Sequence, residues 1–300
     1  MTDNGVQQKP SETALFAALR RTLANKEFGN EKFGPDHLAE YFLPPHFRFF
    51  LRFKKTQANT KEKLNEALPG LTEYMIARTA YFDGLFVDAL KREFPQIVLM
   101  GAGYDTRAYR FAELNRGTKI FELDIAPTQN QKKTYLKKAR IDIPQNVKLV
   151  PIDFNNEALG DVLEKAGFDV LEKALFIWEG VTYYLDAESV DATLNFVSGS
   201  AHPDSILAFD YTLSLSEENL SDYYGAKEFA QTMQEHHAAE ELTFSIQEGE
   251  IESFLEGRNL KMTGHLDNEE IEKKFLTMDN GALIGQMTGH FRIVSASPNK

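Results

Sequence analysis

The first part of the chain carries a helical pattern of apolar positions. From Glu12 onward apolar side chains recur at spacings of three and four residues, and we expect this segment to end at the step from Leu43 to Pro44, because proline interrupts a helix. The longest helical pattern covers residues 71–94, and Pro95 ends it. Residues 1–94 are therefore expected to form an N-terminal helical layer.

A run of phenylalanines and bases, FRFFLRFKK, occupies residues 47–55 of this layer. Aromatic side chains between bases also occur at nucleic-acid-binding surfaces. Helical spacing places Arg48, Arg52 and Lys55 along one face and the apolar side chains on another. We therefore interpret the run as an amphipathic helix.

After Pro95 the pattern changes to short apolar runs that alternate with helical stretches. The apolar runs predict strands at 97–100, 119–123, 147–152, 174–178, 206–209, 260–264 and 290–295, and the stretches between them predict helices at 106–114, 128–141, 156–166, 189–197 and 269–275. This alternation is typical of an α/β fold with a doubly wound, mostly parallel sheet. We expect residues 95–300 to form this α/β domain.

Residues 212–245 interrupt the alternation. The segment carries seven acidic residues and one lysine, with aromatic side chains among them, and it is too long for an ordinary connection. Insertions at the carboxyl ends of sheet strands commonly act as lids over ligand crevices. A solvated helical hairpin without such a role explains the pattern equally well, so both interpretations stay open.

Composition narrows the chemistry that the chain can perform. It has no cysteine, which excludes disulfides, thiolate metal sites and cysteine nucleophiles. Its formal net charge of -12 disfavours a nucleic-acid surface. It also shows neither a long apolar stretch nor the pattern of a secretory signal. We expect a cytoplasmic protein with a small-molecule partner, and neither a nucleic-acid nor a membrane partner.

Two glycines follow the first predicted strand, in the string GAGYDTR. Gly101 and Gly103 let the turn tighten and let a ligand approach the backbone closely, since no side chain stands in the way. A dinucleotide-binding fingerprint would place a third small residue at position 106, where this chain has threonine. The turn alone does not identify the ligand.

Acidic side chains follow the next three predicted strands. Asp124 ends the second strand 23 residues beyond Gly101, where a carboxylate can accept hydrogen bonds from both hydroxyls of a ribose. Asp153 and Phe154 follow the third strand, where they can face an adenine, and Glu179 follows the fourth. Each acid alone is more often a helix cap or a solvated loop charge. Together, the four strand ends indicate an adenosine pocket without a phosphate cradle.

These residues resemble the leucine carboxyl methyltransferase family, which includes bacterial polyketide O-methyltransferases. The matching strings are ART at 77–79, GAGYDTRAYR at 101–110, FELD at 121–124, PIDF at 151–154 and WEGVTYYL at 178–185. The resemblance implies a Rossmann-like class I methyltransferase fold with a seven-stranded sheet, an N-terminal helical layer and a lid. It also implies adenosylmethionine as the cofactor and methyl transfer to a carboxylate or hydroxyl oxygen.

The resemblance also implies roles for individual residues. The expected cofactor contacts are Arg78 at the methionyl carboxylate, Gly101 and Gly103 along the methionyl portion, Asp124 at the ribose, Asp153 and Phe154 at the adenine, and Glu179 near the methionyl amine. A further basic residue is expected near the cofactor, and both Arg20 and Arg21 are candidates. The family often has leucine where this chain has Phe154, a difference with little expected effect.

The acceptor side of the pocket is less well defined. The candidates are Arg20, Tyr183, Tyr184, Asp210 and Tyr211. Aromatic packing under the lid explains the tyrosines equally well. A carboxylate acceptor is already anionic near neutral pH and needs no general base, whereas a phenol or alcohol would benefit from one. No residue stands out as a catalytic acid or base.

The sequence indicates no metal site. His236 and His237 are adjacent, so on a helix their side chains point about 100° apart and could not bind one ion together. Two other functions stay open. One is an oxidoreductase that binds NAD, and the other is a regulatory protein that binds a nucleoside without turnover.

Overall fold

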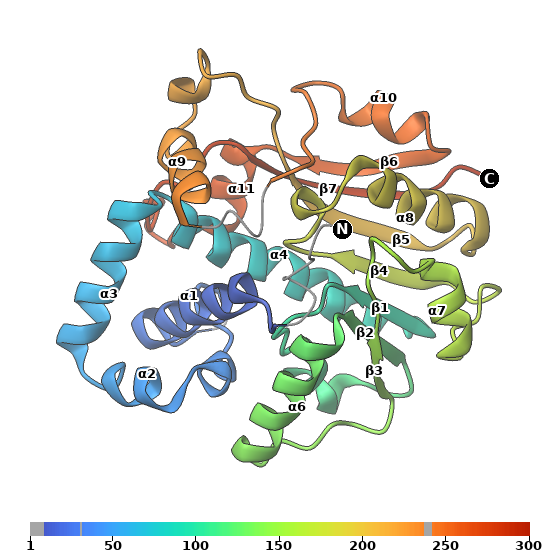
Figure 1. The fold of residues 1–300 in the computed structure, drawn as a ribbon, viewed down its shortest axis with the longest axis horizontal. Coiled ribbons are helices and arrows are strands. Elements are labelled where there is room, and N and C mark those ends of the chain that lie inside the picture. The colour runs from blue at the N-terminus through green and yellow to red at the C-terminus, as the bar shows by residue number, and fades with distance from the viewer. Residues whose placement is uncertain (1–8, 31, 237–241) are drawn as a thin grey trace.

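The structure, a computed structural model, describes residues 9–30, 32–236 and 242–300. Within these residues, seven strands form one sheet in the order β3-β2-β1-β4-β5-β7-β6 (Figure 1). Neighbouring strands pair in parallel except β7, which runs antiparallel to β5 and β6. The strands are β1 (Gln96–Met100), β2 (Lys119–Asp124), β3 (Val147–Pro151), β4 (Ala174–Trp178), β5 (Ile206–Thr212), β6 (Leu260–Leu266) and β7 (Phe291–Pro298). The expected doubly wound, mostly parallel sheet is confirmed.

Side chains of successive strand residues enter two separate cores. In β1, Ile97 and Leu99 pack into one apolar cluster, whereas Val98 and Met100 pack into the other. This alternation follows from the two-residue period of a strand, and burial on both faces explains why the inner strands β1 and β4 are almost entirely apolar. The sheet therefore needs helices on both sides.

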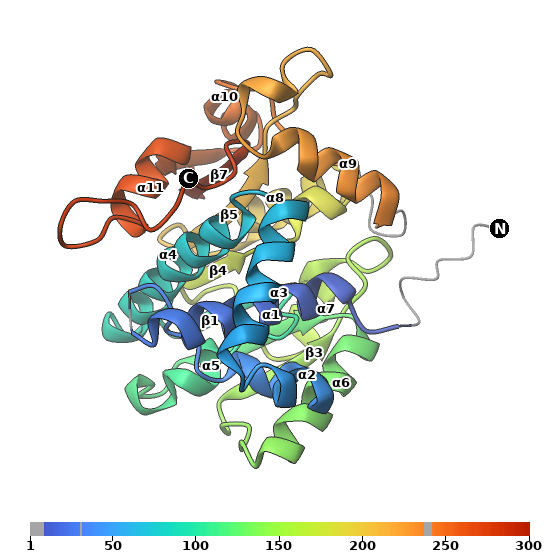
Figure 2. The same cartoon turned by 90° about the vertical axis from the view of Figure 1, so that its left-hand side faces the viewer.

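Helices cover both faces of the sheet. The first face carries α1 (Glu12–Phe28), α4 (Leu71–Lys91), α5 (Arg107–Arg110), α6 (Ala126–Ala139) and α11 (Asn268–Phe275), and the second carries α7 (Leu159–Lys165), α8 (Ala187–Ser200) and α10 (Ile251–Glu256). The remaining helices are α2 (Pro45–Phe50), α3 (Lys54–Ala67) and α9 (Ala226–His236), with short 3-10 turns η2 (Ala39–Phe42), η3 (Ala112–Leu114), η4 (Thr182–Tyr184) and η5 (Leu220–Asp222). In Figure 2, α1, α2 and α3 stand in front of the sheet.

The strand order reverses between β1 and β4. The chain runs outward from β1 to β2 and β3, and then returns to β4 on the other side of β1. At such a switch point the connections after the two strands diverge, which leaves a crevice at their carboxyl ends. The glycine turn after β1 and Glu179 after β4 both lie at this edge.

The first helix is shorter than the apolar pattern predicts. It ends at Phe28 because Gly29 adopts the left-handed conformation (φ 56°) that stops a helix. The prediction that the helical segment continues to Leu43 is therefore wrong. Irregular chain and the 3-10 turn η2 follow instead.

The interpretation of residues 47–55 as one amphipathic helix is also wrong. Helix α2 ends at Phe50 and α3 begins at Lys54, so a bend lies in the middle of the run. Only Leu51 of the run is buried, at 1% exposure. The phenylalanines on either side of it lie at the surface.

Residues 212–245 form part of a strand, a turn and a helix. Thr212 is the last residue of β5, and α9 occupies 226–236. Residues 237–241 of the segment lie outside the described residues. The sequence pattern did not predict α10, whose Ile251 and Leu255 pack into the second core cluster. Within the described part of the chain, no helix has both the length and the apolar character needed to cross a membrane.

A buried ion pair joins α6 to the sheet. Lys132 Nζ of α6 lies 2.6 Å from Glu122 Oε2 of β2, and both side chains are at most 1% exposed. Burial raises the pKa of Glu122, and Lys132 opposes this rise. The nearby charge of Lys132 therefore stabilises the buried carboxylate form of Glu122.

Replacing this lysine should destabilise the fold. Lys132→Met leaves a buried carboxyl without its partner, and we expect a loss of about 3–5 kcal/mol in the free energy of unfolding at pH 8. The loss should be smaller at pH 5, because the raised pKa of Glu122 favours protonation in the folded state. The double variant Glu122→Gln, Lys132→Met should recover most of it. Urea titrations measure the free energy of unfolding of wild type and of both variants. A Lys132→Met variant as stable as wild type would contradict the expectation.

Candidate active site

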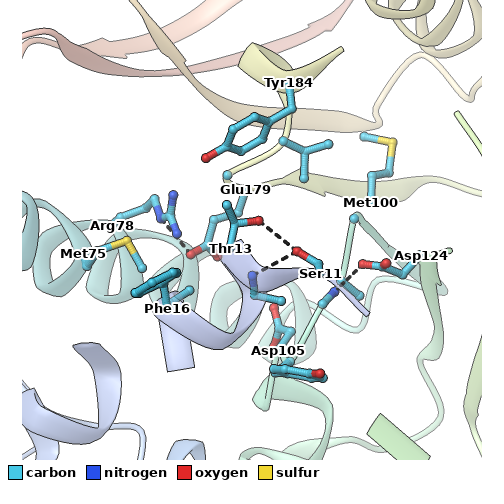
Figure 3. A pocket seen from close by; sticks show the side chains of 18 of the residues that line it. Ser11, Thr13, Phe16, Met75, Arg78, Met100, Asp105, Asp124, Glu179 and Tyr184 are labelled. Carbon is cyan, nitrogen blue, oxygen red and sulfur yellow. Dashed lines mark hydrogen bonds and ion pairs between the residues drawn. The ribbon is translucent and has the colours of Figure 1, made fainter. Parts of the chain in front are cut away.

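A cavity of about 560 Å³ lies at the switch point of the sheet (Figure 3). Its floor is made by the ends of β1, β2 and β4, and its walls by α1, α4 and α9. In Figure 3, Asp124 lies on one side of the cavity and Arg78 with Glu179 on the other, with the first turn of α1 between them. The cavity therefore joins the strand-end residues to the N-terminal helices.

The glycine turn forms the centre of the floor. Gly101 and Gly103 have left-handed backbone conformations, with φ of 66° and 44°. A Cβ atom at Gly101 would collide with the side chain of Val181, and one at Gly103 would lie 3.1 Å from the Cβ of Ala14. Both the conformation and the space therefore require glycine.

The first turn of α1 covers this glycine turn. Ser11 caps the helix by accepting a hydrogen bond from the Ala14 amide at 3.1 Å, and the Ser11 amide donates to Thr128 Oγ1 of α6 at 3.1 Å. The start of α1 is thus tied to α6. Sequence reasoning missed this wall, although a serine directly before Glu12 is a helix-start signal that could have located the turn.

Asp124 is held by two backbone amides. Its Oδ2 accepts from the Gly103 amide at 2.6 Å, and its Oδ1 accepts from the Ile125 amide at 2.8 Å. Burial raises the pKa of Asp124 to about 6, although these hydrogen bonds limit the rise. Thr128 also makes a side-chain hydrogen bond to Asp124, and because a carboxylate can accept about four hydrogen bonds, Asp124 keeps acceptor capacity for a ligand in the cavity.

The third strand end forms the outer edge of the cavity. Asp153 accepts hydrogen bonds from the Asn155 amide at 3.1 Å and from Asn156 Nδ2 at 2.6 Å, as a turn-capping carboxylate does. The ring of Phe154 is partly buried against the second core cluster. Both residues line the cavity.

A chain of alternating charges lies beneath the cavity. Glu179 is shared by two arginines: Oε1 lies 3.0 Å from Arg78 Nε, and Oε2 lies 2.7 Å from Arg107 Nη1. Arg107 also pairs with Asp105 in its own turn and, at 2.8 Å, with Asp83 of α4. These contacts join the end of β4 to α4 and to the turn after β1.

The chain of charges continues toward α1. Asp83 also pairs with Arg110 at 2.7 Å, and Asp36 lies 3.6 Å from Arg110 and 2.8 Å from Arg21. We call the series Arg21, Asp36, Arg110, Asp83, Arg107, Glu179, Arg78 and Asp210 the charge chain. No side chain in it is more than 12% exposed.

Asp210 closes the charge chain below Arg78. Its Oδ1 accepts from the Gly180 amide at 2.6 Å, and its Oδ2 accepts from Tyr74 Oη at 2.6 Å and from Arg78 Nη1 at 3.2 Å. Burial lowers the pKa of Arg78, but its anionic and phenolic neighbours outweigh this and leave it well above the ordinary value. Arg78 therefore stays charged.

The two tyrosines beside Arg78 stay protonated. Burial raises the pKa of Tyr74 and of Tyr183 well above that of an exposed phenol, and the charge of Asp210 raises both further. Tyr183 Oη accepts a hydrogen bond from Arg78 Nη1 at 3.2 Å. Its own hydroxyl hydrogen is then left to point elsewhere, so Tyr183 can donate to a ligand.

Arg20 differs from the arginines of the charge chain. It is 2% exposed, lines the cavity, and donates from Nη1 to Thr72 Oγ1. Its Nη2 is buried and has no hydrogen-bond partner among the described residues. Burial lowers its pKa to about 10, against the raising effect of Glu73, so it is still a cation at neutral pH.

Arg21, the neighbouring candidate, contacts other residues of the protein through two of its guanidinium nitrogens. Its Nε pairs with Asp36, and its Nη2 donates to the Tyr104 carbonyl at 2.8 Å. Of these two arginines, Arg20 is the one with a buried guanidinium nitrogen that has no hydrogen-bond partner among the described residues.

The structure brings ten of the twelve expected site residues to the cavity. They are Arg20, Arg78, Gly101, Gly103, Asp124, Asp153, Phe154, Glu179, Tyr183 and Tyr184. Asp210 lies below the wall and touches it through Arg78 and Gly180. Tyr211 packs into the core on the opposite face of the sheet, with its hydroxyl 3.0 Å from His265 Nε2. Neither of these two lines the cavity.

Sequence reasoning did not find several other wall residues. Phe229 and Met233 of α9 reach the cavity from the segment considered as a lid. Phe16 of α1 and Leu71 of α4 also line it. Their helical spacing predicts burial but does not say against what. Within the described ranges, no group of three or more acidic or histidine side chains is arranged to hold a metal ion.

Known proteins resemble this chain in sequence. A model of the leucine carboxyl methyltransferase family matches residues 14–198. An inferred S-adenosyl-L-methionine-dependent methyltransferase of Bacillus subtilis, YktD, is 30% identical over 218 residues, which are 72% of this chain and 70% of that protein. A relative of the same description from Mycolicibacterium smegmatis is 30% identical over 234 residues, 74% of this chain and 75% of the relative.

Solved structures resemble the fold over almost its full length. An inferred methyltransferase of Thermobifida fusca has a TM-score of 0.60 at 14% identity, and the match covers 97% of this chain and 96% of the Thermobifida chain. A DUF574 family protein of Streptomyces avermitilis has a TM-score of 0.63 at 12% identity, with 97% and 98% covered. At such low identity these likenesses concern the fold.

The family model covers more than half of the chain, including the glycine turn, Asp124 and Glu179. This match favours methyl transfer over the alternative of an oxidoreductase that binds NAD. The chain belongs to the leucine carboxyl methyltransferase family and is an adenosylmethionine-dependent methyltransferase.

Proposed function

We propose that this methyltransferase transfers its methyl group to oxygen, in a carboxylate or hydroxyl of a small molecule, and that a carboxylate is the better acceptor. One observation carries the proposal: the cavity wall holds the cationic Arg20, whose buried Nη2 has no hydrogen-bond partner among the described residues, and no histidine or lysine of those residues lines the cavity. An acceptor that is already anionic fits both facts.

The titratable groups of the lining support an acceptor that needs no base, and Asp124 and Asp153, which also line the cavity, are assigned to the cofactor in this proposal. Among the described residues, the cavity lining contains no histidine or lysine. Asp36, Asp105 and Glu179 are all paired with arginines. The lining phenols Tyr74 and Tyr183 hold their protons because burial raises their pKa values. A carboxylate is ionised at neutral pH and needs no proton removed, whereas an alcohol or ammonium group would need a base.

The cavity wall between α1, α4 and α9 suits an apolar acceptor. The apolar side chains there are Phe16, Leu68, Leu71, Met75, Phe229, Met233 and Phe291. A volume of about 560 Å³ lies within the range of roughly 300–1,000 Å³ that is usual for small-molecule sites. These features support a small acceptor with an apolar body and an acidic group.

The residues present fit adenosylmethionine. Gly101 and Gly103 line the cavity without side chains, so a ligand can approach their backbone closely, and Asp124 has carboxylate lone-pair capacity left for ribose hydroxyls. In the proposed arrangement, Gly101 and Gly103 line the methionyl portion, Asp124 accepts from the ribose, and Asp153 with Phe154 faces the adenine. The observed cavity lining supports this arrangement.

Arg78 and Glu179 are proposed to hold the two ends of the methionyl group. Arg78 Nε lies 3.0 Å from Glu179 Oε1 as an ion pair without a hydrogen bond, and Nη1 donates to Asp210 and Tyr183, which leaves Nη2 for the methionyl carboxylate. Glu179 is placed beside it for the methionyl amine. Asp210 acts through Arg78 and Gly180 as a positioning residue, and Tyr211 receives no part in the site.

When bound, adenosylmethionine supplies a methyl group on a cationic sulfur, and its bond to sulfur breaks as the bond to the acceptor oxygen forms. The protein has to align the acceptor oxygen with that methyl group, opposite the sulfur. Arg20 would hold an acidic group of the acceptor, and Tyr183 would donate a hydrogen bond to it. No proton needs to move when the acceptor is a carboxylate.

The proposal is tested by the chemistry of the product. Purified protein is incubated with methyl-labelled adenosylmethionine and matched sets of apolar carboxylic acids, alcohols, phenols and amines. We expect label in the acids, released as methanol by mild alkali because a methyl ester hydrolyses and an ether does not. Label found only in amines, or no transfer to any oxygen acceptor, would contradict the proposal.

Asp124 should control affinity for adenosylhomocysteine. Asp124→Ala should weaken binding by about 1–3 kcal/mol, since the ribose loses charged hydrogen-bond partners.

In wild type, affinity should fall as pH drops through about 6, where Asp124 gains a proton and loses acceptor capacity. Asp124→Asn should lose this pH dependence, and Asp142→Ala at an exposed site is the control. Calorimetric titrations at pH 5 to 8 measure these affinities. Unchanged affinity in Asp124→Ala would show that Asp124 does not contact the bound ligand.

Arg20 should act on the acceptor more than on the cofactor. For a carboxylate acceptor identified in the product screen, Arg20→Met should raise the KM about tenfold or more, since a charge-assisted hydrogen bond is lost. Adenosylhomocysteine affinity should stay within about threefold, and Arg20→Lys should restore part of the KM. An equal loss of cofactor affinity would place Arg20 at the cofactor instead.

A further inference from the structure

The bend between α2 and α3 exposes four phenylalanine side chains. Phe47, Phe49, Phe50 and Phe53 are 43%, 53%, 54% and 54% exposed. The ring of Phe49 lies 5.7 Å from that of Phe50 and 5.8 Å from that of Phe53, so three of the rings form one patch. Clustered exposed apolar groups of this size mark interaction sites, unlike single surface residues. We call residues 47–55 the aromatic bend.

The fold holds these rings at the surface. Leu51, in the middle of the bend, is 1% exposed and anchors it to the core. Gln57 Nε2 donates to the Leu51 carbonyl at 2.8 Å, and the Phe53 amide donates to the Phe50 carbonyl at 3.1 Å. With Leu51 pointing inward, its neighbours point outward. Neither α2 nor α3 contains a buried residue.

The aromatic bend is also positively charged. Residues 41–61 contain no aspartate or glutamate, although the whole chain carries a net charge of -12. The bend itself holds Arg48, Arg52, Lys54 and Lys55. In the described ranges, none of these four bases is paired with a carboxylate, and Arg48 lies over the ring of Tyr41 at 4.6 Å. A cationic patch thus stands out on an acidic molecule.

Three kinds of partner could cover such a patch, and the observations favour one. A second copy of this chain would bring two cationic patches together, which charge repulsion opposes. A nucleic acid would need open ring faces for stacking, but Phe49 meets Phe50 and Phe53 at 75° and 77°, with ring edges turned to ring faces. The acidic remainder of the chain also repels a long polyanion.

We propose that the aromatic bend docks this protein on a lipid bilayer that contains anionic headgroups. The phenylalanine rings enter the interface, and Arg52, Lys54 and Lys55 contact the headgroups, so apolar and electrostatic attractions act together. Figure 1 places α2 and α3 at one margin of the molecule, away from the sheet, where a flat surface can reach them. The proposal departs from the sequence-based expectation of no membrane partner. That expectation rested on the lack of a long apolar stretch and on the negative net charge of the whole chain.

Vesicle flotation of the full chain tests the proposal. Vesicles of phosphatidylcholine alone are compared with vesicles in which about a third of the lipid is the anionic phosphatidylglycerol. We expect flotation with the anionic vesicles, little with the neutral ones, and a decrease at high salt. Binding to neither, or equal binding to both, would overturn the proposal.

Two variants separate the aromatic and the charged contributions. Phe49→Ser, Phe50→Ser, Phe53→Ser in one chain should reduce anionic-vesicle binding at least tenfold, and Arg52→Gln, Lys54→Gln, Lys55→Gln should reduce it by about fivefold for each charge removed. The matched controls are the exposed residues Lys133, Lys137 and Lys138, changed to Gln, and Val170 with Leu171, changed to Ser. Equal loss in variants and controls would overturn the proposal.

A fluorescent variant reports insertion directly. The chain has a single tryptophan, Trp178, which is fully buried, so Phe50→Trp adds one exposed emitter. Lipids brominated near the headgroup should quench the emission added at position 50 and leave Trp178 unchanged. No quenching under conditions of flotation would overturn the proposal.

Two further outcomes would assign the bend to another partner. Loss of a dimer in the phenylalanine variant, without vesicle binding by wild type, would assign it to a second copy. Displacement from vesicles by single-stranded DNA, with tighter DNA binding through the same residues, would assign it to a nucleic acid. Adenosylhomocysteine affinity of every variant should match wild type, so failure here leaves the proposed methyl transfer untouched.

Discussion

The buried charge chain is the constraint on which the rest of this structure depends. Charged groups inside a protein are tolerated only when each one has a partner, and here four arginines alternate with four carboxylates beneath the cavity. Members of the chain come from α1, α4, α5 and the ends of β4 and β5. The chain of charges therefore holds the N-terminal helices against the sheet edge and sets the shape of the cavity floor.

This arrangement also limits the chemistry. Both carboxylate oxygens of Glu179 lie against guanidinium groups of two arginines, so neither is free to approach an acceptor. The protein can then contribute mainly by positioning, while the cofactor supplies the reactivity. Arg20 is the exception, since its buried Nη2 has no partner in the described part of the chain. In the proposed function, this unpartnered donor favours an anionic acceptor.

Local signals in the sequence located the strands and most of the site. Each expected strand matches an observed one within a few residues, because strands buried on both faces leave continuous apolar runs. The strand ends then place Gly101, Asp124 and Glu179 at one edge. Strand geometry also explains one error of placement. Asp210 and Tyr211 are consecutive residues of β5, so their side chains must point to opposite faces and could not both border one cavity.

The remaining features depend on contacts between distant residues. Asp83 looks like an ordinary helix residue, and its pairing with Arg107 and Arg110 appears only when α4 lies beside the turn after β1. The exposure of the phenylalanines at 47–53 depends on the bend that Leu51 anchors. Helical spacing distinguishes the faces of a helix, but it cannot show whether a partner covers the apolar face.

The central claim is that the charge chain, as a unit, positions Arg78 and Glu179 for the cofactor. A substitution at Asp83 tests this claim most directly, because Asp83 belongs to the charge chain but does not line the cavity. Calorimetric affinity for adenosylhomocysteine is measured for wild type, for Asp83→Asn and for Asp88→Asn, an exposed control on the same helix. The account predicts a loss of about tenfold or more for Asp83→Asn and none for Asp88→Asn. Wild-type affinity in a folded Asp83→Asn protein would contradict it.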